Sequence, residues 1–240
     1  MNDEDTPGLT PPMLPEALAA LEALADPAKA AEMLAYHKAK RRYLGVPVPQ
    51  IEALVAEWRA AATLEDRTAL AAALWDSDIH EARVAAAKLL TQARIRPDDT
   101  AVWDLLCAWV PGFDGWALAD HATIAAQKRL VADPSRLATV ESWTTHPNMW
   151  TRRAALVITL PYAKMSNPKP ADIAIRETAL GWAEAYITDR DWFIQKAVAW
   201  WLRDLSKHDP DRSRAFLAAH GAGLKSFARK EAARHLTATP

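Results

Sequence analysis

Glycine is scarce in this chain, at 7 of 240 residues, which is about 3% against a usual ~7%. Barrels, sandwiches and glycine-rich nucleotide-binding folds need more glycine in their turns than this. The two common phosphate-cradling motifs, G-x-G-x-x-G and G-x-x-x-x-G-K-[ST], are also absent. The low glycine content therefore argues against these fold classes and against a nucleotide held by a glycine-rich loop.

Cysteine and long apolar runs are equally rare. Cys107 is the single cysteine, which excludes an intramolecular disulfide, and no Cys/His spacing resembles a zinc site. No apolar run approaches the ~18 residues of a membrane span, and the N-terminus is acidic and proline-rich, unlike a signal peptide. We expect a protein of a reducing cytoplasm, with no membrane partner, no metal and Cys107 as a buried core thiol.

Alanine and leucine, both strong helix formers, fill an ordinary globular composition of 50% apolar and 25% charged residues. Apolar residues recur at helical spacing almost throughout. Breaks fall at pairs such as Asp-Pro and Asn-Pro, which favour a helix start. No convincing strand or hairpin signal occurs. The pattern predicts an all-α fold with helices over residues 14–25, 27–41, 48–61, 64–75, 77–93, 98–109, 114–131, 134–144, 147–163, 171–187, 190–207, 210–219 and 223–236.

One type of segment recurs, combining small apolar residues with cations: EARVAAAKLL, TRRAALVITL, IQKAVAWWLRDL and ARKEAARHL. With Asp120 of GWALADHATIAA placed between the first two, anchors at Ala85, Asp120, Ala155, Val198 and Ala232 are spaced by 35, 35, 43 and 34 residues. HEAT and armadillo repeats run ~40–47 residues and tetratricopeptide repeats ~34. We therefore predict a curved solenoid of about six HEAT-like helical repeats, whose second helices line a concave face.

Charge is distributed unevenly, although the net charge is only −1. Residues 1–35 carry one lysine and seven acidic residues, whereas residues 190–240 carry ten Lys/Arg and five Asp/Glu. A basic C-terminal part can form a phosphate-binding face on a nearly neutral protein. We predict a flexible tail over residues 1–13 and a single domain over residues 14–240, with the basic part at its C-terminal end.

Polar and aromatic residues on the repeat helices are candidates for one site. Trp116 and Asp120 are four residues apart and share a helix face. Arg153 lies on the corresponding helix of the next unit, and Trp200 and Arg203 lie on the helix after that. Stacked repeats would bring an acid, two indoles and two guanidiniums onto one surface. Each residue also has an ordinary alternative, because helical tryptophans often pack in a core and helical aspartates are often solvated or paired with arginine.

Several motifs follow one another along the chain: Tyr36, Tyr43-Leu44-Gly45-Val46, Leu74-Trp75-Asp76, Trp116-x-x-x-Asp120, Asn148-Met149-Trp150-Thr151-Arg152-Arg153-Ala154-Ala155, Phe193-Ile194-Gln195-Lys196-Ala197, Trp200-x-Leu202-Arg203 and Arg229-Lys230-Glu231-Ala232. In this order the sequence resembles the HEAT-like-repeat alkylpurine DNA glycosylases, the AlkD family of DNA alkylation repair enzymes. The resemblance runs from about residue 25 to residue 236, and the block FIQKAVAWWLRD is its most specific part.

The resemblance implies hydrolysis of the N-glycosidic bond of cationic alkylated purines, such as 7-methylguanine and 3-methyladenine, in duplex DNA. By resemblance, Asp120 matches the catalytic carboxylate, and Trp116 and Trp200 match the indoles that contact the deoxyribose of the lesion. Arg153 matches the arginine that holds the nearby backbone. The residues expected to bind DNA are Tyr36 and Arg203, which match family contacts, and the helical cations Lys196, Arg229 and Lys230.

This activity is chemically coherent. N-alkylation makes the purine a cationic leaving group, and the sugar gains oxocarbenium character as the bond breaks. A carboxylate stabilises that cation and can orient the attacking water, while indole faces attract positively polarised C–H groups. The resemblance also implies action without base flipping and without a metal or organic cofactor. We expect a monomer in a bacterial-type cytoplasm, associated with the nucleoid when bound to DNA.

Some residues depart from the family pattern. Pro47 and Gly115 stand where relatives have a polar or aromatic residue, and Trp201 adds an indole beside the motif. His37 and His121 fall near the candidate helices, and we interpret them as solvated or capping histidines without a role. The alternative to the enzyme is a non-catalytic HEAT-like scaffold that binds branched DNA or a protein partner. The nearly neutral net charge favours this scaffold, whereas the set of candidate site residues favours the glycosylase.

Overall fold

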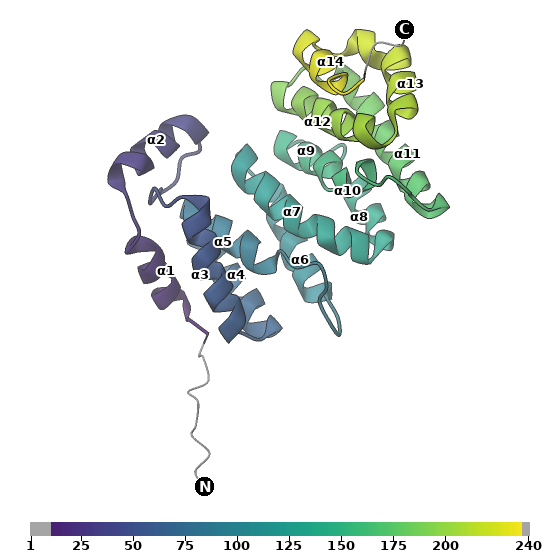
Figure 1. Ribbon diagram of the computed structural model, residues 1–240. Coiled ribbons are helices and arrows are strands. Elements are labelled where there is room, and N and C mark those ends of the chain that lie inside the picture. The colour runs from purple at the N-terminus through teal and green to yellow at the C-terminus, as the bar shows by residue number, and fades with distance from the viewer. Residues whose placement is uncertain (1–10, 237–240) are drawn as a thin grey trace. The chain divides into compact units, whose positions relative to one another are not determined.

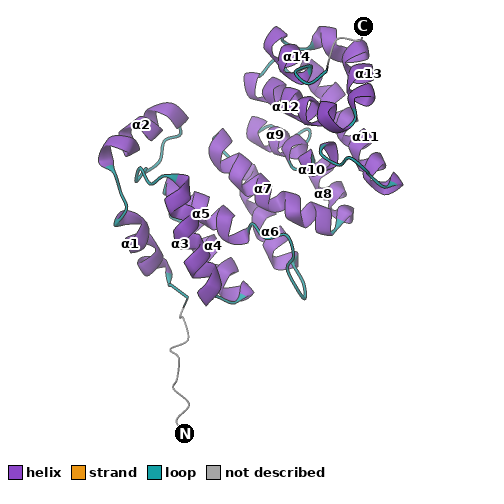
Figure 2. Cartoon of the chain, viewed as in Figure 1, coloured by secondary structure: helices purple, strands orange, loops and turns teal. Residues whose placement is uncertain are grey.

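The computed structural model describes residues 11–236, and these residues are predominantly helical (Figures 1 and 2). Within them no strand occurs, and the one extended pairing is an isolated parallel bridge between Arg42 and Ile79. The predicted all-α fold is therefore confirmed. The predicted tail over residues 1–13 lies outside the described residues except for residues 11–13, which are not helical.

The chain divides into two compact units, residues 1–128 and 129–240. This division does not test the single domain predicted over residues 14–240, which stays a prediction. In the first unit, α5 packs on α3 and α4, and α4 packs on α1 and α6. The helices of this part are α1 (Leu14–Glu22), α2 (Pro27–His37), α3 (Val48–Ala61), α4 (Leu64–Asp76), α5 (His80–Leu90), α6 (Thr100–Trp109), the short η1 (Val110–Gly112) and α7 (Trp116–Ala132), whose last turn passes the division.

In the second unit α12 is the central helix, since it packs on α9, α10, α13 and α14. Its Trp201 is fully buried, and the indole Nε1 donates a hydrogen bond to Thr159 Oγ1 at 3.0 Å. The elements of this unit are η2 (Pro134–Arg136), α8 (Leu137–Glu141), α9 (Met149–Val157), α10 (Leu160–Ala163), α11 (Pro170–Ala185), η3 (Tyr186–Thr188), α12 (Trp192–His208), α13 (Pro210–His220), η4 (Gly221–Gly223) and α14 (Ser226–Ala232).

Local chemistry explains where several helices begin. Asp26 caps α2 by accepting from the backbone N–H groups of Ala28 and Lys29, and Pro27 occupies the first helical position. Thr63 and Asp66 form a reciprocal capping box at the start of α4. These polar side chains satisfy N–H groups that would otherwise lack a partner, which is why Asp-Pro and Thr-x-x-Asp positions mark helix starts.

Several expected helices end earlier than the sequence pattern predicts, and two of them have a clear local cause. The helix expected over residues 147–163 is interrupted between α9 and α10, because Pro161 lacks an N–H and its ring clashes with the carbonyl of Val157, four residues earlier. The helix expected over residues 27–41 stops at His37, because Lys38 takes a left-handed conformation with φ of 61°.

Candidate functional site

Tyr36, His37 and Trp116 form an aromatic group in the first unit. Tyr36 is 69% exposed on α2, and its ring lies edge-on to the Trp116 indole, with 5.9 Å between centroids and 89° between planes. The His37 ring lies 5.3 Å from the same indole. Trp116, the first residue of α7, is partly exposed. Two side chains of α2 therefore hold one edge of an indole that still faces solvent.

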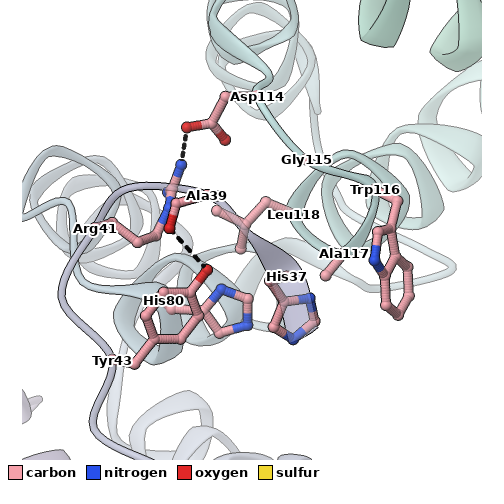
Figure 3. A pocket seen from close by; sticks show the side chains of 10 residues that line it. All are labelled: His37, Ala39, Arg41, Tyr43, His80, Asp114, Gly115, Trp116, Ala117 and Leu118. Carbon is pink, nitrogen blue, oxygen red and sulfur yellow. Dashed lines mark hydrogen bonds and ion pairs between the residues drawn. The ribbon is translucent and has the colours of Figure 1, made fainter. Parts of the chain in front are cut away.

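His37 also continues this group into a buried stack, as Figure 3 shows. Its ring stacks on His80 at 4.7 Å, and His80 stacks on Tyr43 at 4.7 Å. Burial lowers the pKa of His37. Burial, reinforced by His37 and the Arg41 cation, lowers the pKa of His80 to about 3. Both imidazoles are therefore uncharged at neutral pH, and the stack supports Trp116 from inside the unit.

A cavity of about 10 Å³ lies beside these rings, which is the lower limit for one water molecule. Arg41 and Asp114 line it together with His37, His80 and Trp116 (Figure 3). The Arg41 side chain is only 1% exposed, and its guanidinium pairs with Asp114 and, at 3.4 Å, with Asp78. Because Asp114 precedes Trp116 by two residues, this ion pair fixes the start of α7.

The Tyr43-Leu44-Gly45-Val46 motif has a structural explanation. Glu81 is fully buried, and its two carboxylate oxygens accept the backbone N–H groups of Leu44 at 2.9 Å and Gly45 at 2.8 Å. Gly45 has φ of 82°, and a Cβ there would lie 2.2 Å from the Asp26 carbonyl oxygen. The motif therefore anchors the segment after α2 against the start of that helix. Pro47, one of the departures, occupies the position before the first residue of α3 and makes no side-chain capping hydrogen bond.

Asp120 is partly exposed on α7, one helical turn after Trp116, so the two side chains lie on the same side of the helix. The next residue, His121, is half-buried. Burial and then the Lys88 cation lower the pKa of His121 to about 4. Lys88 forms an ion pair with Glu52 at 2.5 Å. At neutral pH this part of the first unit thus carries the Asp120 carboxyl beside an uncharged imidazole.

In the second unit the structure brings Arg153 and Trp200 into contact. The Arg153 guanidinium carbon lies 5.9 Å from the Trp200 ring centroid, and Nη1 donates to the Phe193 carbonyl at 3.0 Å. Trp200 Nε1 donates to Asp204 Oδ2 at 3.0 Å, and the indole is partly exposed. Arg153 is only 3% exposed. Its nearly complete burial suits a residue that orients the indole rather than one that lies open to solvent.

The cations predicted to bind DNA occupy different surroundings. Arg203 is engaged by carboxylates, since it pairs with Glu231 and lies 3.6 Å from Asp204. Lys196 is exposed and places its ammonium 4.7 Å from the Trp192 ring centroid. Arg229 and Lys230 are both exposed on α14.

Residues next to the candidate site residues in the sequence have different surroundings from them. Arg152 pairs with the carboxylate of Asp189 at 3.0 Å, whereas Arg153 contacts the indole. Trp201 belongs to the core. A Cβ at Gly115 would meet only the Ala39 methyl at 3.8 Å, so this position has room for a side chain. Cys107 was expected to be buried but is only half-buried, because it lies beside the core face of α6, which consists of Val102, Trp103, Leu106 and Trp109.

Sequence reasoning missed the stack behind Trp116. His37 received no role, and His80 and Arg41 gave no signal, because the cavity that they line with Trp116 depends on the left-handed turn at Lys38. Trp116 and Asp120 belong to the first unit, and the predicted residues from Arg153 onward belong to the second. The common surface predicted for all of them therefore stays a prediction.

The described residues contain neither a metal-binding cluster nor a membrane-spanning helix. Between residues 11 and 236, no group of three or more His, Cys, Asp or Glu residues is arranged to hold a metal ion. In the same range each helix is too short or too polar to cross a membrane.

The fold and these residues define an all-α helical-repeat protein whose candidate site residues are indoles, arginines and a carboxyl group. The family model described as "DNA alkylation repair enzyme" matches residues 17–236, and the chain therefore belongs to the DNA alkylation repair enzyme family. This membership places the chain among enzymes of DNA repair, with DNA as its partner. No curated protein sequence matches the chain.

Solved structures share the fold. A predicted DNA alkylation repair enzyme from Enterococcus faecalis is 23% identical, with a TM-score of 0.75 over 90% of this chain and 98% of its own. The protein smu.31 from Streptococcus mutans UA159 is 18% identical, with a TM-score of 0.58 over 79% and 93%. AlkD2 from Streptococcus mutans is 19% identical, with a TM-score of 0.58 over 80% and 91%. These likenesses agree with the helical-repeat fold class predicted from the sequence.

Proposed function

We propose that this chain is a monofunctional DNA glycosylase that hydrolyses the N-glycosidic bond of cationic N3- and N7-alkylated purines in duplex DNA. The observation that carries the proposal is the placement of the partly exposed Asp120 carboxyl one turn after the partly exposed Trp116 indole on α7. The contact between Arg153 and Trp200 supports it, because it orients a second indole. The enzyme acts as a cytoplasmic monomer.

The reaction proceeds by departure of the base and capture of water. The bond between C1′ and the purine nitrogen breaks, and its electron pair neutralises the cationic base. The Asp120 carboxylate stabilises the oxocarbenium character of the sugar and orients the water that adds a hydroxyl group to C1′. The proton released from that water passes to Asp120 or to solvent. Trp116 and Trp200 present indole faces to the polarised sugar C–H groups.

The cavity beside Trp116 does not itself offer a pocket for a flipped base. Enzymes that extrude a base enclose it in a pocket shaped for that base. The cavity of about 10 Å³ is far too small for a purine. In this proposal the lesion stays in the duplex, and Tyr36, Lys196, Arg203, Arg229 and Lys230 contact the DNA around it. No metal or organic cofactor takes part, since a cationic base already leaves readily.

The test is release of 7-methylguanine from a methylated duplex. We expect Asp120→Asn to lower the single-turnover rate by ~10²–10³-fold while duplex affinity stays nearly normal, because an amide keeps the shape but lacks the charge. The matched control is Asp104→Asn, which makes the same change at an exposed aspartate on α6. Near-normal excision by the Asp120 variant would remove this carboxylate from the mechanism. Tight duplex binding without any release by the wild type would favour the scaffold instead.

A further inference from the structure

Two aromatic rings lie exposed and in contact in the second unit, on the adjacent helices α12 and α14 (Figure 1). Trp192, the first residue of α12, is 46% exposed, and Phe227 on α14 is 36% exposed. Their ring centroids are 5.7 Å apart, with 30° between the planes. Phe193 meets Trp192 edge-on at 4.9 Å and packs against Trp150 at 4.6 Å. The exposed pair therefore rests on a fixed aromatic base rather than on a loose loop.

The cations around this pair differ from those elsewhere in the same region. Residues 190–236 contain ten Lys/Arg residues. Five of them form ion pairs with carboxylates: Arg203, Lys207, Arg212, Arg214 and Arg234. Within the described residues the other five form none, and they are Arg190, Lys196, Lys225, Arg229 and Lys230. The cations that form no ion pair with a carboxylate thus lie within four residues of Trp192 or Phe227 in the sequence.

Short spacings connect these cations to the two rings. Lys196 follows Trp192 by four residues on the same face of α12 and lies over its ring at 4.7 Å. Lys230 follows Phe227 by three residues on the same face of α14. Arg190 precedes Trp192 by two residues, and its Nη1 donates to the Gly223 carbonyl near the start of α14. The exposed apolar surface is therefore bordered by cations that are available to an anionic ligand.

We propose that Trp192 and Phe227 form a stacking platform for an unpaired nucleobase of single-stranded DNA, with the surrounding cations on its phosphates. Aromatic rings interleaved with cations are how proteins bind single strands without sequence preference. An apolar protein partner would match the rings but leave the unpaired cations unexplained. The inference rests on the proposed function only in taking DNA as the ligand.

The relative strengths of two interactions show how a base can replace the Lys196 ammonium on the Trp192 ring. An exposed cation–π contact is worth roughly 2- to 5-fold in affinity, whereas stacking of a base on an aromatic side chain is worth roughly 5- to 150-fold. A base can therefore displace the ammonium, which then reaches a phosphate. Trp192 and Trp200 lie eight residues apart on one face of α12, or ~12 Å along the helix. A duplex held at Trp200 would thus place an unpaired extension within reach of the platform.

The test compares Trp192→Ala combined with Phe227→Ala against the wild type. Fluorescence anisotropy measures binding to labelled oligothymidylate and to a blunt duplex of the same length. We expect the double variant to lose about tenfold or more in affinity for oligothymidylate and to change by less than about twofold for the duplex. Lys196→Gln should weaken oligothymidylate binding more than Lys207→Gln, a matched control on the same helix whose cation is paired with Asp204.

Folding is checked by the thermal unfolding midpoint, and Trp192→Phe should retain most of the oligothymidylate affinity because it keeps a ring. Unchanged oligothymidylate binding in the double variant, absence of such binding in the wild type, or an equal loss for both DNAs would overturn the platform. Release of 7-methylguanine from a blunt methylated duplex should stay at the wild-type rate in the double variant. The platform and the glycosylase can therefore fail separately.

Discussion

At Gly45 the backbone takes φ of 82° and passes so close to the start of α2 that a side chain has no space. A Cβ there would lie 2.2 Å from the Asp26 carbonyl oxygen and 2.7 Å from the Ala30 nitrogen. The left-handed conformation alone costs an alanine about 1–2 kcal/mol, and the overlap adds to this. We expect Gly45→Ala to lower the free energy of unfolding, measured in urea, by ~2 kcal/mol or more.

Gly181 provides the matched control for this substitution. It lies exposed within α11, and nothing lies within 4 Å of the place where its Cβ would be. Replacing a glycine inside a helix by alanine stabilises by roughly 0.5–1 kcal/mol. Gly181→Ala should therefore raise the free energy of unfolding. Equal effects at the two glycines would contradict the role assigned to Gly45.

The buried histidines make stability depend on pH. The pKa of His80 falls from 6.5 to about 3 and that of His121 from 6.5 to about 4 on folding, in both cases first because of burial. Below pH 6.5 these histidines bind protons in the unfolded chain but not in the folded chain. The stability that their uncharged state contributes is therefore fully present above pH 6.5 and is lost as pH falls. Each histidine lowers the free energy of unfolding by up to about 1.4 kcal/mol for each pH unit of acidification, until the pH reaches its folded pKa.

The measurement is urea unfolding of the wild type and His80→Gln at pH 7.5 and pH 5.0. We expect the variant to lose less stability than the wild type between these two values, by roughly 2 kcal/mol, because one depressed pKa has been removed. His235→Gln, at an exposed histidine, controls for the loss of an imidazole. Parallel pH profiles for the wild type and the His80 variant would show that burial of His80 does not govern this dependence.

Among the elements, α12 connects local chemistry to the candidate site. Asp191 caps it by accepting from the Phe193 N–H at 2.7 Å, and the helix carries both Trp192 and Trp200. Asp191→Ala should lower the free energy of unfolding by ~1 kcal/mol, because the first N–H groups lose their acceptor. Asp191→Asn keeps an acceptor of similar quality and should restore most of the loss. If both variants were equally destabilised, capping would not be the cause.

Most of these elements could be predicted because their signals are local. Asp26 with Pro27, and Thr63 with Asp66, mark helix starts within a few residues, and the observed helices begin there. The interruption before Pro161 was missed because the long apolar pattern continues through it. The stop at Lys38 carries no sequence signal, since a lysine enters the left-handed region only when the surrounding structure requires it.

At the scale of the whole molecule, the site was less predictable than the fold. Spacing placed Trp116 and Asp120 on one face of α7, and resemblance selected Arg153 over Arg152. The His37–His80 stack and the Trp192–Phe227 pair join segments that are distant in sequence. The periodicity of a single helix therefore cannot predict them. The sequence pattern also did not predict which polar side chains are buried. Arg153 and Arg152 are adjacent arginines, yet one is nearly buried against an indole and the other pairs with a carboxylate.

The charge of the lesion should decide what the enzyme releases. A neutral base such as uracil or hypoxanthine needs a proton from a general acid in order to leave, whereas 7-methylguanine is already cationic. The imidazoles of the first unit are poor candidates for that acid at pH 7, because burial lowers the pKa of His80 to about 3 and that of His121 to about 4. We expect single-turnover release of 7-methylguanine, no release of uracil or hypoxanthine from matched duplexes, and unchanged 7-methylguanine release by His121→Gln. Efficient uracil release that disappears in Asp120→Asn would reveal an acid outside this set and would show that leaving-group charge does not select the substrate.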